Sequence, residues 1–182
     1  MLTIGHSTLP IEIFLDILRE NDAEWLVDIR TIPKSRYNPQ FAQENLQKSL
    51  EKAHINYRWQ KNLGGLRHAL KDSINTGWRN SSFRGYADYL QTPEFAAALD
   101  ELLAASSHEQ TAVMCAEAVP WRCHRSLVAD ALLVRGIAVE NIYYDAKGHS
   151  RREQHKLTSF AKVKGRMLWY PAEDDLFAGV DL

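Results

Sequence analysis

One stretch of the sequence decides the fold class: residues 111–136, which read TAVMCAEAVPWRCHRSLVADALLVRG. Its apolar start, from Thr111 to Cys115, has the length and composition of a buried strand, and the later apolar residues recur at helical spacing. Gly136 stands directly after them, where glycine commonly ends a helix. The stretch therefore predicts a strand, a turn and a helix from about Trp121 to Arg135.

The same alternation of apolar runs and amphipathic segments extends along the chain in both directions. Further strands are predicted at Leu2 to Gly5, Trp25 to Ile29, Ile55 to Trp59 and Ala138 to Tyr143, with a weaker candidate at Met167 to Tyr170. Further helices are predicted from Ile11 to Leu18, from Ala42 to Ala53 and from Thr92 to Leu103. This pattern indicates a Rossmann-like, three-layer α/β domain with a mostly parallel sheet of about five strands. Residues 60–82 show no clear period and predict a long functional or mobile loop.

Length and composition narrow the class of protein. The 182 residues, 45% of them hydrophobic, suffice for the core of a single α/β domain, and they exclude disordered, collagen-like and disulfide-scaffold classes. No apolar run is long enough to span a membrane, and the N-terminus does not read as a signal peptide. We therefore expect no membrane partner and a cytoplasmic location, where Cys115 and Cys123 remain thiols or bind a metal.

The net charge of −1 conceals blocks of opposite sign. Residues 29–86 carry +8 and residues 121–168 carry +6, whereas residues 1–28, 87–120 and 169–182 carry −5, −6 and −4. Segregated bases are typical of a protein with one positive face, and such a face can bind a polyanion. An uneven but merely solvated surface would give the same pattern.

Polar residues follow three of the predicted strands. His6 follows the first strand, Asp28 and Arg30 end the second, and Cys115 and Glu117 end the strand at 111–115. Because ligands bind at the carboxyl ends of parallel strands, we expect these side chains to share one pocket. His6, Asp28, Cys115 and Glu117 are the candidate catalytic residues, although each could instead cap a helix or end a strand.

Basic residues near these strand ends are candidates for phosphate binding. Residues 29–39, IRTIPKSRYNP, place three bases on a loop stiffened by proline, and guanidinium groups match phosphate oxygens. The candidate phosphate-binding residues are Arg30, Arg36, Arg67, Arg122, His124 and Arg125. Aromatic residues nearby, such as Tyr37, could stack on bases but are commonly core residues.

The two cysteines leave several interpretations open. A phosphatase loop requires Cys-x5-Arg, but position 121 is Trp, so that interpretation loses its support. Cys115, Cys123 and His124, with or without His6, could bind a metal, yet their spacing fits no standard zinc pattern, and we assign no metal ligand. Cys123 also fits the buried stripe of the predicted helix as a small core residue.

Several motifs occur in the order found in one known family. They are TIGHS at 3–7, LVDIR at 26–30 with Pro33, Ser35, Arg36 and Pro39, LGG at 63–65, Phe83 with Tyr86, MCAE at 114–117 with Pro120, and CHR at 123–125. Over residues 3 to about 145 the chain resembles the domain-of-unknown-function 488 family. The resemblance implies a single α/β domain from a bacterial or archaeal cytosol, without an established reaction. Its motif positions fall on His6, Asp28, Arg30, Arg36, Gly64, Gly65, Cys115, Glu117, Cys123, His124 and Arg125. The basic segment and acidic tail, 146–182, match no motif of the family.

These observations favour an enzyme that acts on a phosphate-bearing substrate, a nucleic acid or a nucleotide, in a cleft at the strand ends. One alternative is a nucleic-acid-binding module without catalytic activity. Another is a thiol or metal protein centred on Cys115, Cys123 and His124. The sequence assigns no cofactor, reaction or oligomeric state.

Overall fold

The computed structural model describes residues 1–106 and 109–172 of the chain. Within these residues one six-stranded sheet has the strand order β3-β2-β4-β1-β5-β6. The strands are β1 (Leu2–Gly5), β2 (Trp25–Asp28), β3 (Asn56–Trp59), β4 (Thr111–Cys115), β5 (Glu140–Tyr144) and β6 (Ser150–Gln154). The first five are parallel, and β6 pairs antiparallel with β5. The prediction of a Rossmann-like α/β fold with a mostly parallel sheet is confirmed.

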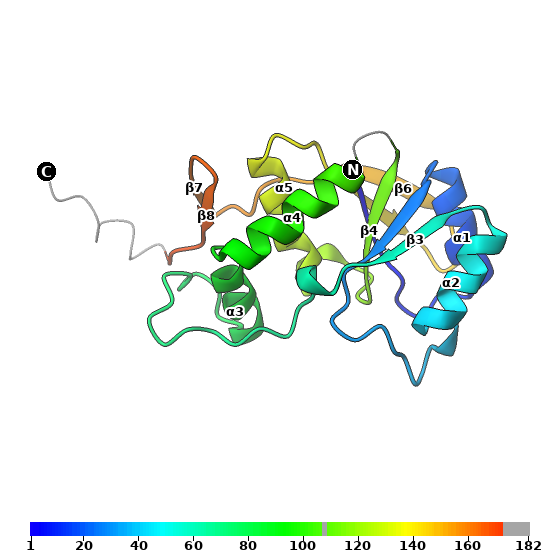
Figure 1. The fold of residues 1–182 in the computed structure, drawn as a ribbon, viewed down its shortest axis with the longest axis horizontal. Helices are drawn as coiled ribbons and strands as arrows, with labels where there is room; N and C mark the ends of the chain where they lie inside the picture. Colours follow the sequence, from blue (N-terminus) through cyan, green and yellow to red (C-terminus); the bar gives the residue numbers. More distant parts are fainter. Residues whose placement is uncertain (107–108, 173–182) are drawn as a thin grey trace, which may run out of the picture.

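Helices cover both faces of the sheet, which gives three layers (Figure 1). The helices are α1 (Ile11–Glu20) and α2 (Gln43–Lys52) on one face, and α3 (Ser81–Tyr89), α4 (Pro93–Ala105) and α5 (Arg125–Val134) on the other. Alternation along β4 explains the two cores, since Ala112 and Met114 belong to the α1 and α2 side while Val113 and Cys115 belong to the other.

The chain path creates a crevice between two neighbouring strands. After β1 the chain crosses one face of the sheet through α1 toward β2, and after β4 it crosses the other face through α5 toward β5. Since β1 and β4 are adjacent and parallel, with Gly5 opposite Cys115, their following loops diverge at the same edge. Ligands bind at such a switch point in open α/β sheets.

The structure differs from the sequence prediction at the start of α5. This helix begins at Arg125 and not near Trp121, because Pro120–Arg122 forms a separate 3-10 turn. Cys123 then has an extended backbone, with φ −135° and ψ 144°, which interrupts the helical path. Pro120 occupies the first position of the 3-10 turn, which is a position that proline favours. The 3-10 turn and α5 therefore start separately, the first at Pro120 and the second at Arg125.

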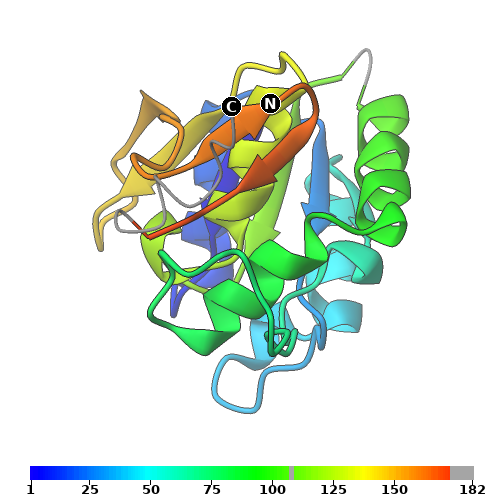
Figure 2. The same ribbon diagram turned by 90° about the vertical axis from the view of Figure 1, so that its left-hand side faces the viewer.

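Other elements were not predicted. Helix α3 ends the irregular region, and its N-cap is Asn80, whose side chain accepts hydrogen bonds from the backbone N–H groups of Ser82 and Phe83. Strand β6 is a polar edge strand with four exposed residues, which carries little hydrophobic periodicity. A hairpin of β7 (Lys162–Lys164) and β8 (Met167–Trp169), the latter expected in part, lies beside α5 (Figure 2).

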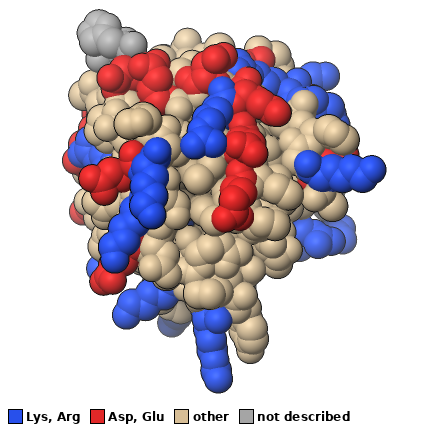
Figure 3. Space-filling view, turned by 90° about the vertical axis from the view of Figure 1, so that its right-hand side faces the viewer, with Lys and Arg blue, Asp and Glu red and all other residues tan. Residues whose placement is uncertain are grey.

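The face of the molecule in Figure 3 carries charged groups of both signs. Lys and Arg lie among Asp and Glu over its upper part, whereas the charged side chains at its lower end are Lys and Arg. Within the described residues no helix is long and apolar enough to cross a membrane. The acidic tail from Glu173 lies outside the described residues, and the cytoplasmic location stays a prediction.

Candidate active site

A pocket of about 600 Å³ opens at the carboxyl edge of the sheet, where β1, β2 and β4 end. Its size lies within the range of small-molecule sites. The predicted site residues that line it are His6, Arg30, Cys115, Glu117, Arg122 and His124. Parallel strand ends thus bring side chains from distant parts of the sequence to one cavity.

His6, at the end of β1, is held in one orientation and one tautomer. Its ring stacks on Phe41 at a centroid distance of 4.1 Å, and the residue is only 3% exposed. Arg30 Nη1, which can only donate, lies 3.2 Å from His6 Nε2, so Nδ1 carries the proton and donates to the Ser7 carbonyl oxygen 2.8 Å away. Burial and the Arg30 charge lower the pKa of His6 to about 4. His6 is therefore neutral at pH 7, with both nitrogens hydrogen-bonded.

Asp28, at the end of β2, fixes Arg30 from behind. Arg30 Nη2 and Nε donate to the Asp28 carboxylate at 2.6 and 2.9 Å, and the Tyr57 hydroxyl donates to it at 2.9 Å. Asp28 is fully buried and does not line the pocket, whereas Arg30 does. Burial and the Asp28 charge raise the pKa of Tyr57. Asp28 thus positions the Arg30 guanidinium at the pocket wall.

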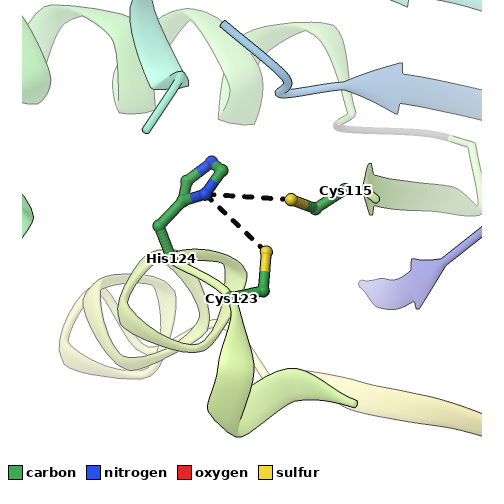
Figure 4. Close-up of side chains that lie close together, drawn as sticks. All are labelled: Cys115, Cys123 and His124. Carbon is green, nitrogen blue, oxygen red and sulfur yellow. Dashed lines mark hydrogen bonds between the residues drawn. The ribbon is translucent and has the colours of Figure 1, made fainter. Parts of the chain in front are cut away.

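Cys115, Cys123 and His124 form a cluster at the floor of the pocket (Figure 4). His124 Nδ1 lies 3.8 Å from Cys115 Sγ and 3.7 Å from Cys123 Sγ, and all three atoms lie within 4.8 Å of one another. The other ring nitrogen, Nε2, lies 3.1 Å from the Ile29 carbonyl oxygen, which can only accept. His124 Nε2 therefore carries a proton, and Nδ1 faces both sulfur atoms.

The thiols of Cys115 and Cys123 shift each other's pKa in opposite directions. A hydrogen bond from the Cys123 thiol, with the nearby His124 and Arg125 charges, lowers the pKa of Cys115 despite its burial. Burial and the neighbouring Cys115 sulfur raise the pKa of Cys123. The Arg125 backbone N–H also donates to Cys123 Sγ at 3.4 Å. The cluster thus favours one thiolate shared between two buried sulfur atoms.

Arg125 shapes the loop that carries Glu117. It is fully buried, and its Nη1 and Nη2 donate to the carbonyl oxygens of Glu117 and Ala118 at 2.9 and 3.2 Å. A Cβ at Gly5 would lie 1.7 Å from the Glu117 carbonyl oxygen, so only glycine lets β1 pass this loop. Glu117 itself is exposed at the pocket, and its carboxylate has no hydrogen-bond or ion-pair partner among the described residues.

Like Arg125, two more of the predicted phosphate-binding residues, Arg67 and Arg36, lie outside the pocket lining. Arg67 stacks on Tyr89, with Cζ 3.6 Å from the ring centroid, and Nε donates to the Gly64 carbonyl oxygen at 3.3 Å. These contacts hold Gly64 and Gly65 in place. Gly65 lies against the His124 ring, because a Cβ built at Gly65 would be 3.0 Å from His124 Nδ1. Arg36 is exposed on the loop after β2.

Lys34 was not among the residues predicted to bind phosphate, although it lines the pocket and is exposed. Its place among three bases on the proline-stiffened loop could have singled it out. Tyr57 was also missed, because its hydroxyl reaches Asp28 only through the pairing of β2 with β3.

Comparison with known families gives the classification. The model of the family described as domain of unknown function DUF488 matches residues 10–132. The chain belongs to this family. The DUF488 match contains every candidate site residue except His6, which precedes it, and it ends before β5. Searches of curated proteins and of solved structures found no match.

Proposed function

We propose that this DUF488 protein is an enzyme that acts on a phosphate-bearing substrate, a nucleotide or a nucleic acid, in the pocket at the carboxyl edge of the sheet. One observation carries the proposal: a single cavity is lined both by cations and by groups able to perform chemistry. The cations are Arg30, Lys34 and Arg122, and the reactive groups are Cys115 and Glu117.

The cations differ in how they would hold an anion. Arg30 is fixed by Asp28 and His6, so it would offer its donors in one place at little entropic cost. Lys34 and Arg122 are exposed and would close on the anion from solvent. Arg36, exposed on the same loop as Lys34, would contact further phosphates of a longer substrate. Arg125 and Arg67, which bind backbone carbonyl oxygens, would position the surrounding loops.

The reactive groups would have distinct roles. Glu117 is solvent-accessible and unpartnered among the described residues, which suits a general acid or base that must exchange protons. His6 has both nitrogens occupied, so it would orient Arg30. Cys115 supplies an ionisable sulfur at the pocket floor, next to Cys123 and His124.

Ligand binding tests the first half of this proposal. Inorganic phosphate, nucleoside monophosphates and a short single-stranded oligonucleotide are titrated into the protein by calorimetry at low salt. We expect Arg122→Ala to weaken binding about 10-fold or more, because a charge-assisted hydrogen bond contributes about 1.5–3 kcal/mol. Lys48→Ala, an exposed base on α2 outside the pocket, is the charge-matched control and should leave affinity unchanged. The proposal fails if none of the ligands binds, or if both variants behave alike.

Turnover distinguishes the enzyme from a nucleic-acid-binding module. Exposed aromatic residues near the site, Tyr37 at 89% and Trp121 at 63% exposure, favour the module as the second candidate. A module should lose affinity steeply as salt rises and tolerate Glu117→Gln, whereas the enzyme should keep ligand binding in Glu117→Gln but lose turnover of generic phosphate esters.

A further inference from the structure

We propose that Cys115, Cys123 and His124 bind a zinc ion, with a fourth coordination position that faces the pocket. The proposal deepens the proposed function, because the ion would supply a Lewis acid to the substrate site, but the binding of zinc can be tested without any substrate. The spacing of these residues in the sequence had led us to assign no metal ligand.

The distances between donor atoms fit this ion. Zinc bonds of about 2.3 Å to sulfur and about 2.0–2.1 Å to nitrogen, at the tetrahedral angle, place the two donors about 3.5–3.6 Å apart. The measured separations of His124 Nδ1 from the two sulfur atoms are 3.8 and 3.7 Å. The same bond length and angle place two sulfur ligands about 3.8 Å apart, within the 4.8 Å that spans all three donor atoms.

The histidine is oriented as a metal ligand. Ligating histidines commonly donate their second ring N–H to a carbonyl oxygen, which fixes the tautomer and the direction of the lone pair. His124 Nε2 donates in this way to Ile29, and Nδ1 points at the sulfur pair. The Gly65 backbone and the Tyr86 ring, whose centroid is 4.8 Å from that of His124, confine the imidazole.

Charge balance supports a divalent ion at this depth. Cys115 and Cys123 are only 5% and 4% exposed, and an unpaired second thiolate there would be costly. Two thiolates and a neutral imidazole would cancel the charge of Zn²⁺. The Arg125 backbone N–H would donate to the Cys123 thiolate, as it does to Cys123 Sγ now.

Three protein ligands leave one position for water or substrate. Structural zinc sites use four protein ligands, whereas catalytic sites use three and keep the fourth open. His6 is directed to Ser7 and Arg30 and does not belong to the cluster. Because all three ligands line the pocket, the open position would face Glu117 and the pocket cations.

Standard zinc patterns miss this site because they describe two pairs of ligands, each pair separated by only a few residues. Here Cys115 ends β4, while Cys123 and His124 follow the 3-10 turn at Pro120–Arg122. The return of the chain over the strand end, and not the spacing of eight residues, brings the sulfur atoms together.

Metal analysis tests the proposal directly. Untagged protein is reconstituted with zinc under reducing conditions, dialysed and analysed by elemental mass spectrometry. We expect one zinc per chain in the wild type and in His68→Asn, an exposed histidine outside the pocket, and loss of zinc in Cys115→Ser, Cys123→Ser and His124→Asn. A wild type without zinc, or one zinc retained in all three ligand variants, would overturn the assignment.

Cobalt gives a second measurement, which is read only in variants shown to be folded. Bound Co²⁺ should show thiolate-to-metal charge-transfer absorption in the wild type, and this absorption should weaken or vanish in each cysteine variant whose circular dichroism is native. A cobalt complex without that absorption contradicts sulfur ligation. Zinc binding without phosphate binding would refute the proposed function alone, and phosphate binding by metal-free protein that takes up no zinc would refute this inference alone.

Discussion

Two buried aspartates in this molecule have similar partners and different surroundings. Asp28 accepts from Arg30 and from the Tyr57 hydroxyl, and Asp130 on α5 accepts from His155 at 2.8 Å and from the Tyr170 hydroxyl at 2.9 Å. Both carboxylates are fully buried. Each pairing satisfies a charge that would otherwise be costly in the core.

The two aspartates differ in the location of their partners. Arg30 also borders the pocket, so the Asp28 pair presents a cation to a ligand. The Asp130 partners all belong to the segment after β5, including the Thr158 backbone N–H, so this pair attaches that segment to α5. The comparison teaches that a buried carboxylate contributes to the candidate site when it holds a cation where parallel strands end, whereas Asp130 on α5 holds two segments of the chain together.

The largest effect should come from Asp130→Asn. Three partners lose a charged acceptor at a fully buried position, and breaking such a buried network costs about 3–5 kcal/mol. Urea unfolding followed by circular dichroism measures the loss, and Asp72→Asn, on an exposed turn, is the control. Unchanged ligand affinity of the folded fraction is expected, and reduced affinity would mean that the two regions are coupled.

The free energy of unfolding should depend on pH through His6. Its pKa is lowered from 6.5 to about 4 in the folded state, so the stability from the neutral ring is fully present above pH 6.5 and is lost as the pH falls toward 4. The loss amounts to at most about 3 kcal/mol. The difference in unfolding free energy between wild type and His6→Gln should shrink over this range. A difference independent of pH, or an equal effect in the exposed His68→Gln, would contradict it.

Asp28→Asn should affect both stability and ligand binding. We expect a loss of about 2–3 kcal/mol, less than for Asp130, because water in the pocket can solvate the unpaired Arg30. Phosphate affinity should fall as well, since Arg30 is no longer held in place. Calorimetry with phosphate measures this, and full affinity in Asp28→Asn would remove the positioning role.

The smallest effects should come from the two tyrosine hydroxyls. Tyr57→Phe and Tyr170→Phe each remove one hydrogen bond to a carboxylate, at a cost of about 1–2 kcal/mol by urea unfolding. Only Tyr57→Phe should also weaken phosphate binding, through Asp28 and Arg30. Equal effects of both variants on phosphate binding would erase the distinction between the two regions.

The hydrophobic pattern predicted strands from short apolar runs and helices from apolar residues at helical spacing. The strands β1, β2, β3 and β4 and the helices α1, α2 and α4 were expected close to their observed bounds, and β1 and β4 are buried on both faces. Strand β6 and the short strand β7 were missed, because their side chains are mostly exposed and polar. The start of α5 was misplaced because the backbone at Cys123 departs from helix within an apolar stripe.

The candidate site was predictable to the level of the strand ends and no further. The positions of His6, Arg30, Cys115 and Glu117 after parallel strands indicated a shared pocket, and the structure places all four in its lining. The positioning roles of Asp28 and Arg67 depend in part on Tyr57 and Tyr89, which come from other segments. The role of Arg125 depends on the path of the loop that carries Glu117 and Ala118. Local spacing does not contain these contacts.

The sequence by itself determined the α/β class, the mostly parallel sheet and the edge at which polar groups gather, because hydrophobic burial follows from residue order within each segment. Only the tertiary structure decided which carboxylate holds which cation, which nitrogen of His124 carries the proton, and that two cysteines eight residues apart meet the same imidazole. Hydrogen bonds and metal coordination depend on distances of a few ångströms between atoms, and those distances exist only after separate segments have packed together.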